Sequence, residues 1–181
     1  MRVLGISGSL RADSYNSQLL HAARDLLPEG SELEVFDGIR DLPHYDQDLD
    51  NDGVSAPVQA LRERIRAADV LLIATPEYNG SIPGLLKNAI DWASRPRGSA
   101  SLANKPVAVI GATTGSFGGV WAQADTRKVL GIAGARVIES DVAIPLAPER
   151  FAGGGLVDAK FRAQLGELML RLAEFDIADA A

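Results

Sequence analysis

Three short segments hold most of the side chains that could bind a ligand. The first, residues 7–17, places Arg11 among several hydroxyl groups and follows an apolar stretch. It joins an expected strand to the start of an expected helix, where free backbone amides and the helix dipole attract anions. Arg11 adds a charged fork that suits phosphate. We therefore predict phosphate binding here; the alternative is an ordinary loop in which Ser14 caps the helix.

The second segment, residues 75–84, contains two prolines and two glycines that restrict its backbone, with Tyr78 as the only large side chain in its middle. Rigid amides beside one aromatic ring suit the edge of a planar ligand. The alternative is a turn whose tyrosine packs on a neighbour. The third segment, residues 111–119, is rich in glycine and threonine, and its glycines allow a ligand or another backbone to approach closely.

Alternating strand and helix patterns must position these segments. Apolar runs predict strands at residues 3–7, 32–37, 70–75, 107–112 and 135–138. Apolar residues at steps of three and four predict helices at residues 14–27, 57–67, 83–92, 119–133 and 158–175. This alternation predicts an α/β fold with a doubly wound, five-stranded parallel sheet. We expect a single domain over residues 1–181, with a frayed tail at 177–181.

The strand patterns also predict where a ligand binds. The strands that begin at residues 3, 70 and 107 are continuously apolar, as in the middle of a sheet, whereas the other two are mixed, as at edges. With right-handed crossovers the simplest order is 2-1-3-4-5. Ligands bind such sheets beyond the carboxyl ends of the strands, where the order reverses. The loops there are residues 8–15 and 76–83, with 113–119 beside them.

Composition excludes several classes of function. The net charge of −6 and the pI of about 4.9 argue against a nucleic-acid partner, because phosphate backbones require basic patches. The chain has no cysteine, which excludes disulfides and thiolate chemistry. No apolar run approaches the roughly 20 residues that span a bilayer. The amino-terminal residues enter an apolar strand without the pattern of a signal peptide, so we expect a cytoplasmic protein that does not associate with membranes.

Familiar catalytic and metal-binding motifs are missing from the sequence. It contains neither the phosphate-binding Gly-x-x-x-x-Gly-Lys-Ser/Thr motif nor Gly-x-Gly-x-x-Gly in its first turn. Residues 5–9 break the Gly-x-Ser-x-Gly pattern of a serine hydrolase at its last position. His21 and His44 have no spacing that supports a metal site. We therefore predict no catalytic side chain and no metal ligand.

Two of the segments, taken in full, resemble a known family. Gly8-Ser9-Leu10-Arg11 with Ser14-x-Asn16, and the long stretch over residues 76–92, resemble the NADPH-dependent FMN reductase family. Residues 42–48 and 115–119 extend the resemblance over nearly the whole chain. That family includes quinone, azo-dye and chromate reductases, and the resemblance implies a flavodoxin-like fold.

The resemblance implies a set of cofactor-binding residues. For the FMN phosphate they are Ser9, Arg11, Asn16 and Ser17, with the amides around Ser14 and Tyr15. For the edge of the isoalloxazine ring they are Pro76, Glu77, Tyr78, Asn79 and Gly80. For the ribityl or ring side they are Thr113, Thr114 and Gly115.

The implied activity is hydride transfer from NADPH or NADH through FMN to a small-molecule electron acceptor: a quinone, an azo compound, a metal oxyanion or free flavin. Alternatives are a flavodoxin-like one-electron carrier, a non-catalytic FMN-binding sensor, and a flavin-free nucleotide-processing enzyme. The resemblance further implies a homodimer or homotetramer. Its interface candidates lie on the third and fourth helices and include Trp92 and Trp121, for which core packing is the alternative. Residues 147–157 do not map onto the family pattern.

Overall fold

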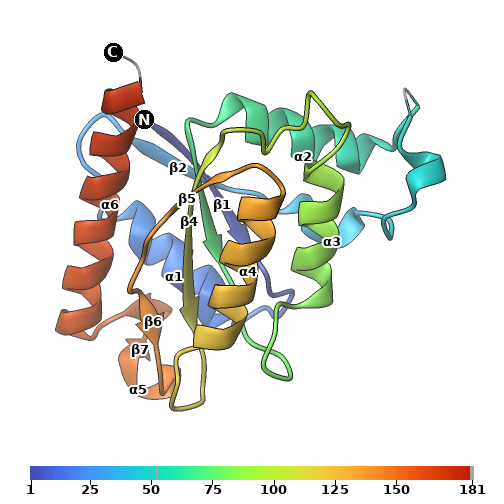
Figure 1. Ribbon diagram of the computed structural model, residues 1–181. Coiled ribbons are helices and arrows are strands. Elements are labelled where there is room, and N and C mark those ends of the chain that lie inside the picture. Colours follow the sequence, from blue (N-terminus) through green and yellow to red (C-terminus); the bar gives the residue numbers. More distant parts are fainter. Residues whose placement is uncertain (52, 180–181) are drawn as a thin grey trace.

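A parallel β-sheet forms the centre of the protein, whose computed structural model describes residues 1–51 and 53–179 (Figure 1). Its main strands are β1 (Arg2–Ser7), β2 (Glu32–Val35), β3 (Val70–Ala74), β4 (Pro106–Ala112) and β5 (Arg136–Ile138). They lie in the order β2-β1-β3-β4-β5, which confirms the predicted order. A sixth short strand, β6 (Ala143–Ile144), pairs with the carboxyl end of β4 and was not predicted.

The position of each strand in the sheet explains its sequence. Every residue of β3 and β4 is buried, because these central strands are covered on both faces. β2 and β5 are only partly buried and lie at the two edges, as their mixed sequences predicted.

Helices cover both faces of the sheet (Figure 1). They are α1 (Tyr15–Arg24), α2 (Ala56–Ala67), α3 (Gly84–Ala93), α4 (Val120–Ile132) and α6 (Ala159–Asp179). One apolar core lies between the sheet and α1 with α6, and includes Leu19 and Leu165. A second core lies between the other face and α2, α3 and α4, and includes Leu61, Leu86 and Leu130. Within the described residues, none of the helices is both long and apolar enough to cross a bilayer.

Two helices end more than one residue away from the predicted position. α1 ends at Arg24, three residues before the expected position 27, and begins after Ser14, which is its N-cap. α6 continues to Asp179, past the expected end at 175, because neither glycine nor proline follows to stop it. The expected frayed tail at 177–181 is thus helical up to Asp179, and its last two residues lie outside the described residues.

Two regions that gave no periodic signal contain short elements. Residues 38–51, for which neither a strand nor a helix was predicted, hold two 3₁₀ turns, η1 (Gly38–Asp41) and η2 (Gln47–Leu49), and bury Ile39 in the core. Residues 147–156 form α5 (Ala147–Arg150) and a hairpin of β7 (Phe151–Ala152) and β8 (Gly155–Leu156) that packs against α1. Elements of two to four residues are too short for a periodic pattern to reveal.

Candidate functional site

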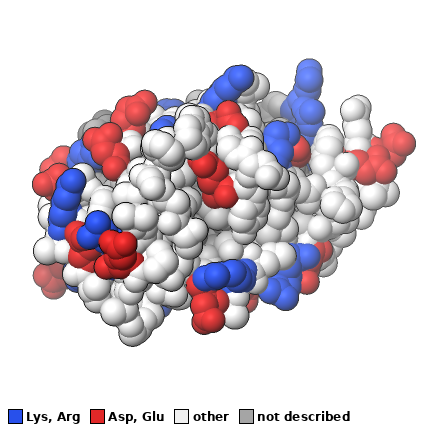
Figure 2. Space-filling model, turned by 90° about the horizontal axis from the view of Figure 1, so that it is seen from below, with Lys and Arg blue, Asp and Glu red and all other residues white. Residues whose placement is uncertain are grey.

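The three predicted loops meet at the carboxyl edge of the sheet. They enclose an open cleft of about 200 Å³. Figure 2 views the molecule from this side, and side chains other than Lys, Arg, Asp and Glu cover most of the middle of this face. The residues that line the cleft are Ser9, Arg11, Ser14, Tyr15, Asn16, Pro76, Glu77, Tyr78, Ala112, Thr113 and Thr114.

This lining contains most of the predicted cofactor-binding residues. Ser17, Asn79, Gly80 and Gly115 belong to the same loops but lie outside the lining. Ala112 lines the cleft and was not predicted. It is the last residue of β4, so its position at the carboxyl end of a central strand is the signal that could have identified it.

The first loop places Arg11 beside the start of α1. Its guanidinium donates a hydrogen bond to the carbonyl oxygen of Asp13 and lies 5.7 Å from the centre of the Tyr15 ring. The hydroxyl of Ser9 accepts a hydrogen bond from the Arg11 amide at 3.3 Å. Arg11 is therefore held at the rim of the cleft, next to the amides of the first helical turn, where an anion is favoured.

Ser17 and Asn16 use their side chains within the protein. The Ser17 hydroxyl lies 3.0 Å from the Ser7 hydroxyl. The buried Asn16 amide both donates to the carbonyl oxygen of Ala112 and accepts from its N–H, each at 3.0 Å. These two bonds join the first loop to the end of β4. In the described structure Asn16 thus fixes the distance between two walls of the cleft.

The second loop is a tight β-turn. Tyr78 and Ser81 exchange two backbone hydrogen bonds of 3.3 and 3.1 Å. The two residues between them, Asn79 and Gly80, have φ angles of 53° and 71°, which is the backbone of a type I′ turn. The Asn-Gly pair therefore sets the turn and is not part of the cleft lining, whereas Tyr78, 53% exposed, lies at the rim.

Side chains of the second loop bind α4. One carboxylate oxygen of Glu77 accepts hydrogen bonds from the backbone N–H groups of Trp121 and Ala122, both at 3.1 Å. The Ser81 hydroxyl donates to the Asp125 carboxylate at 2.6 Å. No sequence pattern identified these contacts, because they join residues more than 40 positions apart.

The third loop is held by the segment that follows β5. The amide of Thr113 donates to the carbonyl of Ile144, and the amides of Leu146 and Ala147 donate to carbonyls of the loop at 3.0 and 2.9 Å. Gly118 has a φ of 64°, and a Cβ there would lie 2.7 Å from the carbonyl carbon of Ala143. Only glycine fits this close approach to β6.

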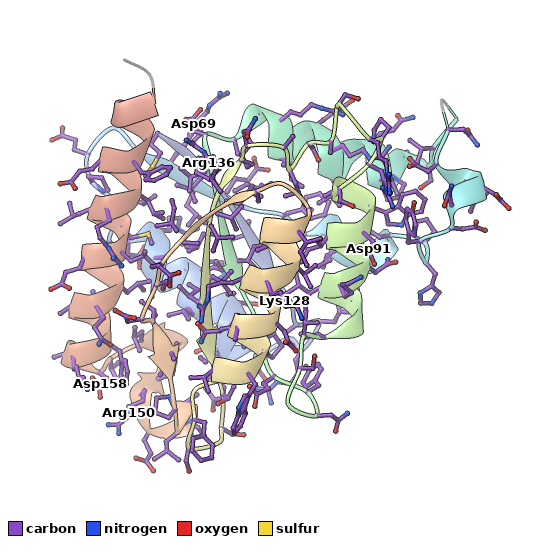
Figure 3. The ribbon with its side chains drawn as sticks, viewed as in Figure 1. Asp69, Asp91, Lys128, Arg136, Arg150 and Asp158 are labelled. Carbon is purple, nitrogen blue, oxygen red and sulfur yellow. The ribbon has the colours of Figure 1, made fainter. Side chains whose placement is uncertain are left out.

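The segment over residues 147–157 supports the site from outside. The Phe151 ring lies 5.3 Å from the Tyr15 ring of the first loop. At the base of its hairpin Arg150 donates to the Asp158 carboxylate at 3.0 Å, and Figure 3 labels both residues at the same edge of the molecule. This segment thus packs against the first loop and hydrogen bonds to the third.

The two tryptophans lie in different environments. Trp92 is fully buried, and its indole N–H donates to the Pro43 carbonyl at 2.8 Å. Its expected place in a subunit interface is therefore wrong, and the core alternative holds. Trp121 is 51% exposed and contacts Phe117, with ring centres 5.1 Å apart.

A larger hollow of about 630 Å³ lies away from the three loops, between α3 and α4. Its lining combines apolar side chains such as Ile90 and Ile132 with the polar chains of Lys87, Asp91 and Arg97. Ile132 is 79% exposed. The hollow shares no lining residue with the cleft, so it is a separate feature of the surface.

Two pKa values are altered at the opposite edge of the sheet, where Figure 3 labels Asp69. Burial alone would raise the pKa of Asp69, but hydrogen bonds from the Arg2 amide and guanidinium outweigh it and lower the pKa. Burial also lowers the pKa of Lys105, and the nearby Asp69 carboxylate partly offsets this decrease. Among the described residues, no group of three His, Cys, Asp or Glu side chains is arranged to hold a metal ion.

Comparisons with known proteins agree on one family. A family model described as NADPH-dependent FMN reductase matches residues 1–149. An NAD(P)H-dependent FMN reductase of Pseudomonas aeruginosa, PA1204, is 46% identical over 164 residues, which cover 90% of this chain and 88% of that protein. A 2-hydroxy-1,4-benzoquinone reductase of a Burkholderia species is also 46% identical, over 129 residues that cover 71% of this chain and 69% of the other.

A solved structure shares the whole fold. The flavoenzyme NAD(P)H:(acceptor) oxidoreductase FerB of Paracoccus denitrificans superposes with a TM-score of 0.88 at 36% sequence identity. The match covers 98% of this chain and 97% of that one. The predicted flavodoxin-like topology is thereby confirmed.

Proposed function

Because this chain belongs to the NADPH-dependent FMN reductase family, and is thus an oxidoreductase that uses FMN and NAD(P)H, we propose that the cleft at the three loops holds FMN and serves hydride transfer from NAD(P)H to a quinone. The observation that carries the proposal is the convergence of the three loops, with a helix start and Arg11 at one end of the cleft. The quinone is the acceptor in the name of one of the most similar relatives.

The residues of the cleft fit FMN chemically. A phosphate is matched by the first-turn amides of α1, the Ser9 hydroxyl and the Arg11 guanidinium, all donors on one wall. The ring is matched by the wall of Pro76 and Glu77 and by the backbone at Thr113 and Thr114. When bound, FMN supplies the acceptance and release of a hydride, which protein side chains do not provide.

The chain's own residues would bind the cofactor, orient it and shield it. Arg11 and the start of α1 would hold one end of the cofactor, and the rigid turn after β3 would hold the other end. Backbone N–H groups of these loops would favour negative charge on a bound ring. Tyr78, exposed at the rim, offers an aromatic surface to a planar acceptor. No side chain is assigned as nucleophile or general base.

We further propose that two copies associate through the face of α3 and α4. Val120, Trp121 and Ile132 are large exposed apolar residues on α4, and the hollow of about 630 Å³ lies between the two helices. Replacing Ile132 with aspartate would then reduce the mass measured by light scattering after gel filtration. An unchanged mass would contradict an interface at this face. A cytoplasmic location stays a prediction.

The enzymatic proposal has a direct test. Purified protein freed of flavin is mixed with NADPH and 1,4-benzoquinone, and oxidation of NADPH is followed by its absorbance with and without added FMN. We expect oxidation that depends on both FMN and the quinone. Bound FMN without NADPH oxidation would instead support a carrier or a sensor.

A further inference from the structure

The helix α4 begins without a cap of its own. Its N-cap position is Gly119, which has a left-handed φ of 75° and no side chain that could accept a hydrogen bond. The first amides of any α-helix have no acceptor within the helix. Gly118 and Gly119 cannot easily be replaced by a capping serine or aspartate, because both have positive φ angles and Gly118 abuts β6.

A carboxylate from a different loop replaces the missing cap. Glu77, which follows β3, accepts from the N–H groups of Trp121 and Ala122 with one oxygen, each at 3.1 Å. A negative charge at this end of α4 is also favoured by the helix dipole. Glu77 is half-buried, so solvent screens this contact only in part.

The same carboxylate connects two walls of the cleft. The backbone of Glu77 belongs to the wall after β3, whereas Trp121 follows directly from the loop after β4 that supplies Thr113 and Thr114. Ser81 and Asp125 make a second connection one turn further along α4, at 2.6 Å. With only this second bond, the end of the loop that faces the cleft would be free to move relative to α4.

We propose that Glu77 is a positioning residue: its carboxylate caps α4 and thereby sets the separation of the two walls that would receive the flavin ring. The proposal rests on the function proposed above. It gives Glu77 a role distinct from the cofactor contact implied by the family pattern, because its side chain binds α4. The carboxylate acts as an acceptor of two N–H groups, so an amide oxygen of the same reach can replace it.

The cap is tested first in the flavin-free protein. Hydrogen exchange is followed by mass spectrometry in peptides that span the first turn of α4, for wild type, Glu77→Ala and Glu77→Gln. Loss of a helix cap costs about 1 kcal/mol, so we expect exchange about fivefold faster in Glu77→Ala. Hydrogen exchange in Glu77→Gln should stay close to the wild-type rate. Glu63→Ala, which removes an exposed carboxylate on α2, is the matched control. Equal exchange rates in Glu77→Ala and wild type would contradict the proposal that Glu77 caps α4.

The effect on the cleft is tested by titrating FMN fluorescence with the same proteins. We expect the Kd for FMN to rise about tenfold in Glu77→Ala, or about 1.4 kcal/mol, and less than about threefold in Glu77→Gln. A Glu77→Ala protein that binds FMN as wild type does, or a Glu77→Gln protein as impaired as Glu77→Ala, would overturn the positioning role. If wild type itself binds no FMN, the proposed function fails, and the positioning role fails with it.

Discussion

Removing the charge of Arg11 should weaken FMN binding in a way that the structure allows us to estimate. The guanidinium lies at the rim of the cleft, held by the Asp13 carbonyl and by the Tyr15 ring at 5.7 Å. A hydrogen bond between charged partners contributes about 1.5–3 kcal/mol. Arg11 is exposed, so solvent moves the value to the lower end of that range.

The expected change for Arg11→Ala is thus about 1.5 kcal/mol, which is roughly a tenfold rise in Kd. The Kd of Arg11→Lys for FMN should lie between those of Arg11→Ala and wild type, because an ammonium keeps the charge but lacks the planar fork of a guanidinium. Both effects should shrink at high salt, which screens an exposed charge.

Quenching of FMN fluorescence on addition of the flavin-free protein gives the Kd directly. Arg24→Ala is the matched control, because it removes an exposed arginine from the far end of α1, where the side chain lies 3.8 Å from the Asp25 carboxylate. A Kd for Arg11→Ala within twofold of both wild type and Arg24→Ala would refute the phosphate role of Arg11.

Three further predictions concern stability. Gly118→Ala should lower the free energy of unfolding by about 2 kcal/mol or more, because its Cβ would lie 2.7 Å from a backbone atom. Gly84→Ala is the control, and it should leave the free energy of unfolding nearly unchanged because the space around Gly84 is open. Equal urea midpoints for the two variants would contradict this prediction. Trp92→Phe should cost about 1–3 kcal/mol in the same assay, because it removes the bond to Pro43 and leaves a cavity; an unchanged midpoint would argue against the core assignment. The pKa of Asp69 is lowered by folding, so its contribution is present above its unfolded pKa and lost as pH falls through the folded value. Asp69→Asn should therefore be less stable than wild type at neutral pH and equally stable well below about pH 4; a stability difference independent of pH would disprove the linkage.

The order of the strands could be predicted because burial is encoded in local patterns. β3 and β4 are apolar at every position since both of their faces are covered, and this separates them from the mixed edge strands β2 and β5. Once the order is known, the place where it reverses locates the cleft. The loops after β1, β3 and β4 do line it.

The roles of individual side chains could not be predicted in the same way. Asn16 pairs with Ala112, 96 positions away, and Glu77 caps a helix 44 positions further on. Such partners follow from the packing of the whole chain and leave no local signature. The position of Trp92 also depends on that packing, because a tryptophan on an amphipathic helix suits a core and an interface equally.

An anaerobic titration of the FMN-reconstituted protein with NADPH, followed by its visible spectrum, tests whether the protein transfers hydride through FMN. We expect the protein to retain FMN and the visible bands of the flavin to bleach with one NADPH per flavin. Addition of 1,4-benzoquinone should then restore the bands. A protein that retains no FMN, or whose bound FMN is not bleached by NADPH or NADH, would contradict the proposed function.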